Sequence, residues 1–156
     1  MKKWIPIALS IFIALVFVQS LPFKFGNSFE TQHIFVTLAS WSGITWFGAY
    51  GGYIIGTAEL LTTVLLFTPL RALAALAALV IVSGAIFSHV FTPLGIIMPT
   101  FDSSTGLQVG NDSGVLFIMA CITWLCASIL VWLDLTSYDS LLRRIAGVDT
   151  KQDIIR

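Results

Sequence analysis

The sequence predicts an all-α fold: a transmembrane four-helix bundle with a short outer interfacial helix and an amphipathic cytoplasmic C-terminal helix. Of the 156 residues, 57% are hydrophobic and only 10% are charged, and the mean hydropathy is +0.94. Soluble domains carry about 25% charged residues, so a chain of this composition cannot cover a water-exposed surface. Four stretches are long and apolar enough to cross the bilayer core, which is about 30 Å thick.

Composition and spacing exclude several other classes of protein. The 8 basic and 8 acidic residues balance, and no basic patch can neutralise phosphates, so no nucleic acid is expected as a partner. Abundant aromatic and branched side chains exclude a disordered chain. Cys121 and Cys126 are too few for a disulfide scaffold, and their spacing is not that of a Cys-x-x-Cys redox pair. No metal-ligand spacing, phosphate-binding loop or nucleophile elbow is recognisable.

The four expected spans form one membrane domain covering residues 1–156. They run over residues 4–23, 47–68, 72–91 and 115–133. We expect helices because only a helix satisfies its own backbone hydrogen bonds in lipid. A cleaved signal peptide is the alternative for the first span, because Lys2 and Lys3 precede its apolar core and residues 18–20 resemble a cleavage site.

Basic residues predict the orientation, because loops rich in Lys and Arg stay in the cytoplasm. Most of them lie at the chain ends or between the second and third spans: Lys2, Lys3, Arg71, Arg143, Arg144, Lys151 and Arg156. On the opposite side stands Lys24. We therefore expect both termini in the cytoplasm and the long connections outside.

The outer segment of residues 24–46 is too apolar for a plain loop. Its apolar residues recur at helical spacing: Ile34, Leu38 and Trp41. This pattern predicts a short helix in the outer interface, with Asn27 and Glu30 capping its start. Trp41 and Trp46 are expected at headgroup depth.

The other connections are simpler. Residues 68–71 are so few that the second and third spans must form an antiparallel hairpin. Residues 92–114 are rich in Pro, Gly, Ser and Asp without periodicity, which predicts an outer loop. In the tail of residues 134–156, apolar side chains from Tyr138 to Val148 recur at helical spacing, and Arg143 and Arg144 suit anionic lipid.

One face of the second span is made of small and polar residues. At 100° per residue, this face contains Gly48, Gly52, Gly56, Glu59 and Thr63. Small side chains let a neighbouring helix approach closely, and alanines on the third span predict that this neighbour is the third span. Glu59 lies near mid-span, where a charged group costs on the order of 2.5 kcal/mol, so it is expected to be protonated or paired. Its role is functional, or it is a structural carboxyl that hydrogen-bonds neighbouring helices.

A second group of polar residues maps to the outer half of the chain: Lys24, Glu30, His33, His89 and Asp112. Together they are expected to line a polar pocket above Glu59. His89 has a side chain whose pKa suits proton exchange, but the rise of about 1.5 Å per residue puts it roughly 10 Å from Glu59 in depth. The simpler role of Lys24 is to extend its ammonium group to the membrane interface, and the simpler role of Asp112 is to stabilise a helix N-terminus.

The order and spacing of several short motifs resemble the DoxX-like family of small membrane proteins. The motifs are Phe23-Lys24-Phe25, Gly56-Thr57-Ala58-Glu59, Pro69-Leu70-Arg71, Gly84-Ala85-Ile86-Phe87-Ser88-His89 and Asn111-Asp112-Ser113-Gly114. The resemblance covers residues 17–130 and implies a four-helix bundle in the bacterial inner membrane. The family takes its name from a subunit of a thiosulfate:quinone oxidoreductase. Thr62 and Thr63 depart from its pattern, which often has glycine there.

The resemblance and the polar residues together predict a redox-associated subunit that binds a quinone or similar apolar carrier. Glu59 and His89 are the candidate catalytic residues, managing protons, while Lys24 and Asp112 are the candidate ligand-binding residues. No resident cofactor or metal is identifiable, so electrons would come from a redox partner protein or from the quinone. A non-enzymatic scaffold, working as a homo-oligomer or with a partner, is the alternative. A small transporter or proton path is the third hypothesis.

Overall fold

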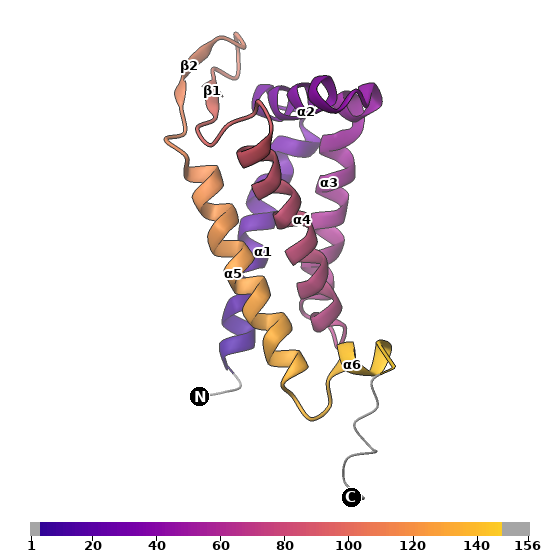
Figure 1. Cartoon of the computed structure of the whole chain (residues 1–156). Coiled ribbons are helices and arrows are strands. Elements are labelled where there is room, and N and C mark those ends of the chain that lie inside the picture. The colour runs from indigo at the N-terminus through magenta and orange to yellow at the C-terminus, as the bar shows by residue number, and fades with distance from the viewer. Residues whose placement is uncertain (1–3, 148–156) are drawn as a thin grey trace, which may run out of the picture.

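The computed structural model describes residues 4–147, and it is built almost entirely from helices. In chain order the elements are α1 (Trp4–Phe25), α2 (Phe29–Ser42), α3 (Thr45–Leu65), α4 (Arg71–Phe91), β1 (Pro99–Phe101), β2 (Gln108–Asn111), α5 (Val115–Leu135) and α6 (Leu141–Ile145). Figure 1 shows α1, α3, α4 and α5 side by side as a bundle, with α2 lying across one end. The β1–β2 hairpin stands at that same end, and α6 lies at the opposite end.

Three of the long helices, α1, α4 and α5, are long and apolar enough to cross a membrane. Each has 21 or 22 residues, which at a rise of 1.5 Å per residue gives about 32 Å, close to the thickness of the hydrocarbon core. α3 also has 21 residues, but its glycines, threonines and Glu59 make it less apolar. The sequence thus predicted the long helices to within about three residues at each end.

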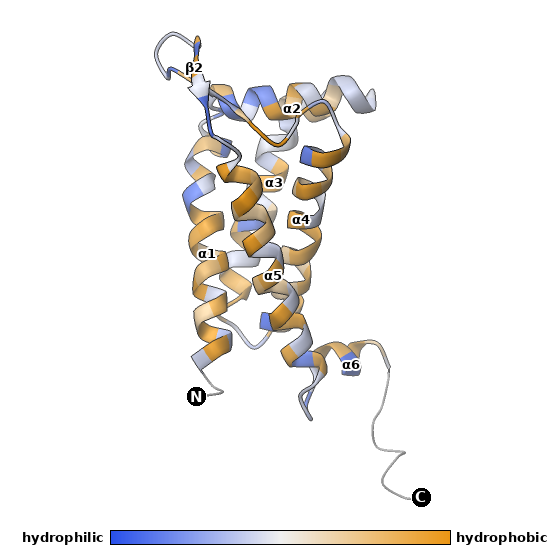
Figure 2. Cartoon of the chain, turned by 60° about the vertical axis from the view of Figure 1, so that its left-hand side comes forward, coloured by the Kyte–Doolittle hydropathy of each residue, from blue (hydrophilic) through white to orange (hydrophobic). Residues whose placement is uncertain are grey.

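The outside of the bundle is apolar. Large hydrophobic side chains on every long helix are exposed, among them Leu15, Leu61, Val80 and Leu125. Figure 2 shows hydrophobic colour along the long helices, with hydrophilic residues concentrated near α2, the hairpin and α6. Soluble monomers rarely expose such a continuous apolar surface. This belt is the surface expected of a protein surrounded by lipid.

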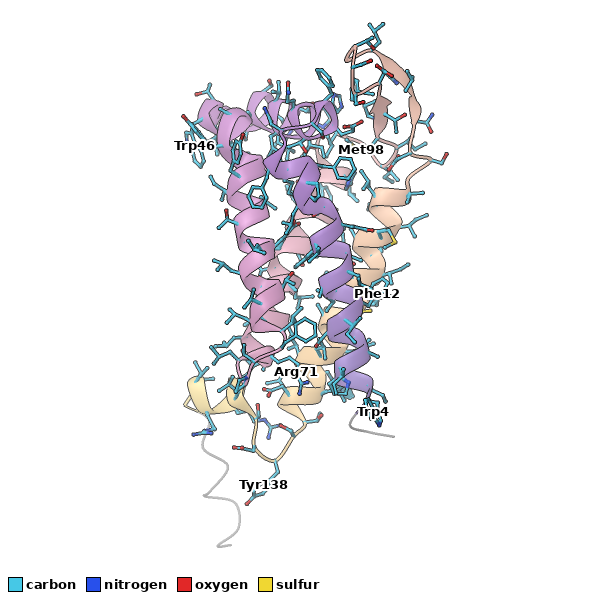
Figure 3. The ribbon with its side chains drawn as sticks, turned by 180° about the vertical axis from the view of Figure 1, so that it is seen from behind. Trp4, Phe12, Trp46, Arg71, Met98 and Tyr138 are labelled. Atoms are coloured by element: carbon cyan, nitrogen blue, oxygen red, sulfur yellow. The ribbon has the colours of Figure 1, made fainter. Side chains whose placement is uncertain are left out.

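Aromatic and basic side chains mark the two ends of the bundle, as Figure 3 shows. Trp46 lies at the end covered by α2, whereas Trp4, Arg71 and Tyr138 lie at the other end. We call these the outer and the inner end. Aromatic side chains at both ends are typical of proteins whose rings sit at headgroup depth.

The hydrophobic core fills the inner half of the bundle. It is formed by Ile13, Ala14, Phe17, Leu66, Ala74, Ala75, Ala78, Val82, Ala127 and Leu130. The alanines of α4 let the helices approach closely there. Towards the outer end the packing of α4 changes, because Gly84 and Ala85 are exposed there.

The glycine face of α3 packs against α1 and α2, so the expectation that it faces the third span was wrong. A Cβ added at Gly56 would lie 3.3 Å from the Cβ of Lys24 on α1, and one at Gly51 would overlap the ring of Phe35 on α2. Glycine is needed at these positions because backbone and bulky side chains meet there. The partner is α1 because the chain between them, α2, crosses the bundle end and returns α3 beside α1.

α2 begins one residue later than the capping motif predicted. Its N-cap is Ser28, whose Oγ accepts a hydrogen bond from the Thr31 backbone N–H at 3.3 Å. Asn27 precedes the cap with a positive φ of 49°, so it makes the turn after α1 instead. Glu30 does not complete a capping box, because its Oε1 accepts a hydrogen bond from the Phe101 N–H in the hairpin, at 3.0 Å.

The outer loop of residues 92–114 contains an antiparallel hairpin that the sequence did not predict. β1 and β2 pair Pro99 with Asn111 and Phe101 with Gln108, with an irregularity beside Phe101. Each strand is too short for a visible alternation of apolar and polar residues, so the sequence gives only a weak indication of a hairpin. Within this loop, Asp102 makes a turn by accepting hydrogen bonds from Ser104 and Thr105.

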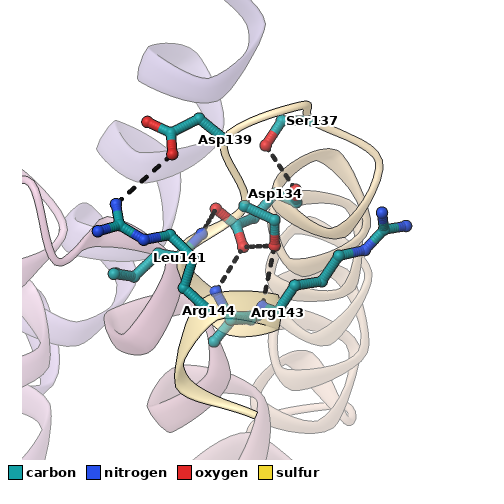
Figure 4. A network of polar contacts seen from close by, with 8 residues as sticks. Asp134, Ser137, Asp139, Leu141, Arg143 and Arg144 are labelled. Carbon is teal, nitrogen blue, oxygen red and sulfur yellow. Dashed lines mark hydrogen bonds and ion pairs between the residues drawn. The ribbon is translucent and has the colours of Figure 1, made fainter. Parts of the chain in front are cut away.

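The inner end of the bundle is closed by α6, which is short. Asp134 at the end of α5 accepts hydrogen bonds from the Ser140 hydroxyl at 2.8 Å and from the N–H groups of Leu141 and Leu142, as Figure 4 shows in part. The described helix of the tail has only 5 residues, shorter than the amphipathic pattern suggested. Val148 and the rest of that pattern lie outside the described residues.

Candidate functional site

A cavity of about 570 Å³ lies in the outer half of the bundle, beneath α2. α1, α2, α3, α4 and α5 all contribute to its walls. Most of the lining is apolar, with Phe17, Phe23, Phe35, Phe47, Ile55, Ile81, Val82, Leu94, Leu116 and Met119 among the residues that form it. Gly84 and Ala85 line the cavity and are exposed, so it opens between the helices towards the apolar belt.

An ion pair lies in the wall where α1 and α3 meet. Lys24 Nζ lies 2.8 Å from Glu59 Oε2, and the two side chains are 18% and 9% exposed. Ser20 completes the group: its Oγ accepts a hydrogen bond from Lys24 Nζ at 2.7 Å and lies 2.9 Å from Glu59 Oε2. Ser20 and Lys24 are one helical turn apart on α1, so both reach the same carboxylate. Glu59 was expected to be protonated or paired, and this geometry agrees with the paired alternative.

Gly56 explains how Lys24 reaches a carboxylate so deep in the bundle. Gly56 precedes Glu59 by one helical turn on the same face of α3, and it is buried against the Cβ of Lys24. Without a side chain at this position, the aliphatic part of Lys24 passes along α3. Its ammonium group then lies beside Glu59 instead of snorkelling outwards.

Two polar atoms of this group have hydrogen-bonding capacity left. An ammonium group has three N–H bonds, and Lys24 uses one for Glu59 and one for Ser20. Within residues 4–147, Oε1 of Glu59 accepts no hydrogen bond, since both contacts of its carboxylate go to Oε2. The wall therefore offers one donor and one acceptor close together.

His89 lies on the α4 side of the cavity and is 8% exposed. Its Nδ1 lies 2.6 Å from the carbonyl oxygen of Gly95. A carbonyl only accepts, so Nδ1 carries a hydrogen and donates it. The ring edge also contacts Phe117, with centroids 5.8 Å apart. His89 makes no hydrogen bond to Glu59 among the described residues, in line with their expected separation in depth.

α2 forms the roof of the cavity through Glu30, Thr31, Ile34 and Phe35. The Thr31 hydroxyl donates to the Phe23 carbonyl at 3.0 Å, which fixes the roof to α1. Burial raises the pKa of the Glu30 carboxyl, but hydrogen bonds from its own backbone N–H, from Phe101 and from Ser28 outweigh this, so the pKa is lowered. The roof thus carries a negative charge at neutral pH.

The structure brings together four of the polar residues that the sequence singled out and leaves two outside. Lys24, Glu30, Glu59 and His89 line the cavity. His33 instead contacts the ring of Phe101, with centroids 5.8 Å apart. Asp112, expected to bind ligand, is not among the residues that line this cavity.

Asp112 positions the start of α5. Its Oδ1 accepts hydrogen bonds from the N–H groups of Met98 and Gly114 at 2.7 and 2.9 Å, and its Oδ2 accepts one from Leu116 at 3.0 Å. Burial raises the pKa of this carboxyl, but these three hydrogen bonds and the nearby His89 outweigh it, so the pKa is lowered. Both carboxylate oxygens are engaged, which agrees with the simpler helix-stabilising role.

Sequence reasoning missed Ser20 and Thr123, the hydroxyls on α1 and α5 that also line the cavity. Serine and threonine are common in membrane helices, where they return a hydrogen bond to the preceding turn, as Thr123 does to Met119 at 2.7 Å. Ser20 could have been found from its spacing of four residues from Lys24. That signal has meaning only once α1 and α3 are known to be neighbours.

A second, smaller cavity of about 360 Å³ lies at the inner end. Its charged lining residues are Arg71, Asp134 and Asp139. Asp134 already accepts hydrogen bonds from Ser140, Leu141 and Leu142, and Asp139 lies 3.5 Å from Arg144. In the described part of the chain no cluster of three His, Cys, Asp or Glu residues is placed to hold a metal ion.

No protein-family model, curated protein or solved structure matches the chain.

Proposed function

We propose that the chain is a DoxX-like membrane protein that binds a quinone or a similar apolar carrier in the outer cavity, as a redox-associated subunit. The observation that supports this most is the cavity itself: an apolar space of about 570 Å³ with a few polar groups on its walls. Small-molecule sites are typically apolar clefts of about 300–1,000 Å³ with a few polar groups that fix orientation.

The polar groups suit a carrier whose head changes protonation. A quinone takes up two electrons and two protons when it becomes a hydroquinone. In the proposed site Lys24 Nζ donates its remaining N–H to a head-group oxygen, and Glu59 and His89 exchange protons with the cavity. The electrons come from a redox partner protein, or a second carrier molecule exchanges them with the first.

The proposed setting is the bacterial inner membrane, with α3 crossing beside α1, α4 and α5 and both termini in the cytoplasm. Support comes from the apolar belt and from the position of Arg71 at the inner end, away from α2. The opening beside Gly84 and Ala85 would face the bilayer, from which an apolar carrier enters.

The test is to extract the protein in mild detergent and identify the retained small molecules by mass spectrometry. We expect wild type to retain a quinone or related carrier and Glu59→Gln to lose most of it while remaining folded. Asp139→Asn, the same chemical change on the exposed inner surface, should retain it. If no carrier is found in any of the three, and added decylubiquinone does not bind to wild type, the proposal fails. Recovery of a stoichiometric protein partner equally from all three would favour the scaffold.

A further inference from the structure

We infer that the outer cavity selects amphiphiles with an uncharged, oxygen-bearing head and rejects those with a carboxylate head, such as fatty acids. This inference rests on the proposed function, because it concerns the carrier bound in the same cavity. It goes further by assigning the charge of the carrier's head. A cavity that recognised only the hydrophobic tail would admit fatty acids as readily as neutral carriers.

The charges on the cavity walls carry the argument. The lining includes one lysine, Lys24, and two glutamates, Glu30 and Glu59, beside His89. Lys24 is the cation that an anionic head would need, but Glu59 Oε2 already lies 2.8 Å from its Nζ. Glu30 adds a second carboxylate in the roof, which accepts a hydrogen bond from the Phe101 N–H and forms no ion pair with a cation of residues 4–147. A carboxylate head therefore meets a neutralised lysine and one uncompensated negative charge.

The cost of an anionic head is high in such a place. Moving a carboxylate out of water carries a large desolvation penalty, which only a well-placed opposite charge offsets. Here the carboxylate oxygen that accepts no hydrogen bond among residues 4–147 is Oε1 of Glu59, and its charge has the same sign as that of a carboxylate head. Two carboxylates that share a site do not both ionise readily.

An uncharged oxygen head avoids both costs and uses the groups that remain. A carbonyl or hydroxyl oxygen accepts the third N–H of Lys24, and a hydroxyl hydrogen donates to Glu59 Oε1. The site is thus built for a head that accepts one hydrogen bond and donates another.

The experiment compares probes that differ only in their heads. Full-length protein in nanodiscs is titrated with radiolabelled 1-dodecanol and dodecanoate, at a pH well above the carboxyl pKa of dodecanoate, and empty nanodiscs correct for partition into lipid. We expect 1-dodecanol to bind at least about tenfold more tightly than dodecanoate, a difference equal to about 1.4 kcal/mol. Dodecanoate binding as tightly as 1-dodecanol would overturn the inference. Absence of binding by both probes, and by decylubiquinone, would instead remove the proposed function.

Variants show whether the wall charges cause the selection. In Glu59→Gln the charge of Lys24 is no longer neutralised, so dodecanoate should gain about tenfold relative to 1-dodecanol. Glu30→Gln, which keeps an oxygen for the Phe101 N–H, should shift the ratio in the same direction and serves if Glu59→Gln does not fold. Asp102→Asn removes a carboxylate of the hairpin turn that is not among the lining residues, and it should leave the ratio unchanged. An unchanged ratio in both glutamate variants would overturn the inference.

Discussion

Lys24 Nζ lies 2.8 Å from Glu59 Oε2, and this contact joins the outer end of α1 to the middle of α3. The lysine neutralises a charge that would otherwise stand alone in an apolar bundle. Both side chains are largely buried, so each depends on the other. The effects of substituting the two residues on the free energy of unfolding are therefore expected to be strongly coupled.

A double-mutant cycle measures this coupling. Lys24→Met and Glu59→Gln should each lower the free energy of unfolding, Lys24→Met by about 3 kcal/mol because it leaves an uncompensated buried carboxylate. The double variant should be more stable than Lys24→Met, since no unpaired charge is left. Unfolding titrations in mixed detergent micelles give the three values. Strictly additive losses would contradict a buried, coupled pair.

Gly51 and Gly84 form a matched pair of alanine substitutions. A Cβ at Gly51 would overlap the Phe35 ring, whereas a Cβ at Gly84 would have no atom within 4 Å. Gly51→Ala should therefore lower the free energy of unfolding by about 1–3 kcal/mol through overpacking. Gly84→Ala should raise it by up to about 1 kcal/mol, because alanine favours the helix. Thermal unfolding of both variants tests the difference, and equal effects would contradict the packing of α2 on α3.

The exposed position of Gly84 also allows a test of entry into the cavity. Gly84→Leu places a bulky side chain beside the opening without meeting a neighbour at its Cβ. We expect this variant to bind decylubiquinone more slowly in stopped-flow measurements, while its free energy of unfolding stays close to that of Gly84→Ala. Binding as fast as in Gly84→Ala would show that the carrier enters elsewhere.

Asp112 should make stability depend on pH in acid. Its pKa in the folded protein is lowered from the ordinary value of 3.8, so its contribution is fully present above that value. The contribution is lost as the pH falls through the lower, folded pKa. Asp112→Asn should cost up to about 1 kcal/mol, because a neutral amide interacts less favourably than a carboxylate with the N–H groups at the start of α5, and it should show a smaller loss on acidification. Parallel acid dependences in the two proteins would contradict this role.

The contact of Glu30 with Phe101 should protect one amide in the hairpin. Glu30→Ala removes the acceptor, and hydrogen exchange at the Phe101 N–H should accelerate by about tenfold, as expected for the loss of a hydrogen bond to a charged group. Glu30→Gln keeps an oxygen at this position and should have a smaller effect. Amide exchange resolved by residue provides the measurement. Unchanged exchange in Glu30→Ala would mean that the hairpin is held by its strand pairing alone.

Hydrophobicity and length predicted the long helices because these properties are local. The same holds for the turn before Arg71 and for the helix of residues 29–42, whose position in the membrane interface stays a prediction. The hairpin of residues 99–111 escaped prediction because its two strands are too short for a visible alternation. The cap at Ser28 was misplaced by one residue, since Asn27 and Ser28 are both residue types that favour caps.

The site was predicted in composition but not in connectivity. Depth along the helices was sufficient to place Lys24, Glu30 and His89 in the outer half, above Glu59 at mid-span. The same reasoning also placed His33 and Asp112 in this group, but neither lines the cavity. The sequence did not indicate which helix faces Glu59, because alanines on α4 and the glycine face of α3 suggested each other as partners. Which long helices become neighbours depends on the direction in which α2 carries the chain across the bundle. The amphipathic pattern of α2 is too weak to predict that direction.

The ion pair between α1 and α3 has a consequence for biosynthesis under the proposed membrane orientation. Lys24 leaves the ribosome before Glu59, so α1 is available as a partner when α3 is inserted. A charged carboxylate entering lipid alone costs on the order of 2.5 kcal/mol, whereas one entering beside Lys24 is neutralised at once. Under this proposal α1 would assist the insertion of α3, the least apolar of the long helices.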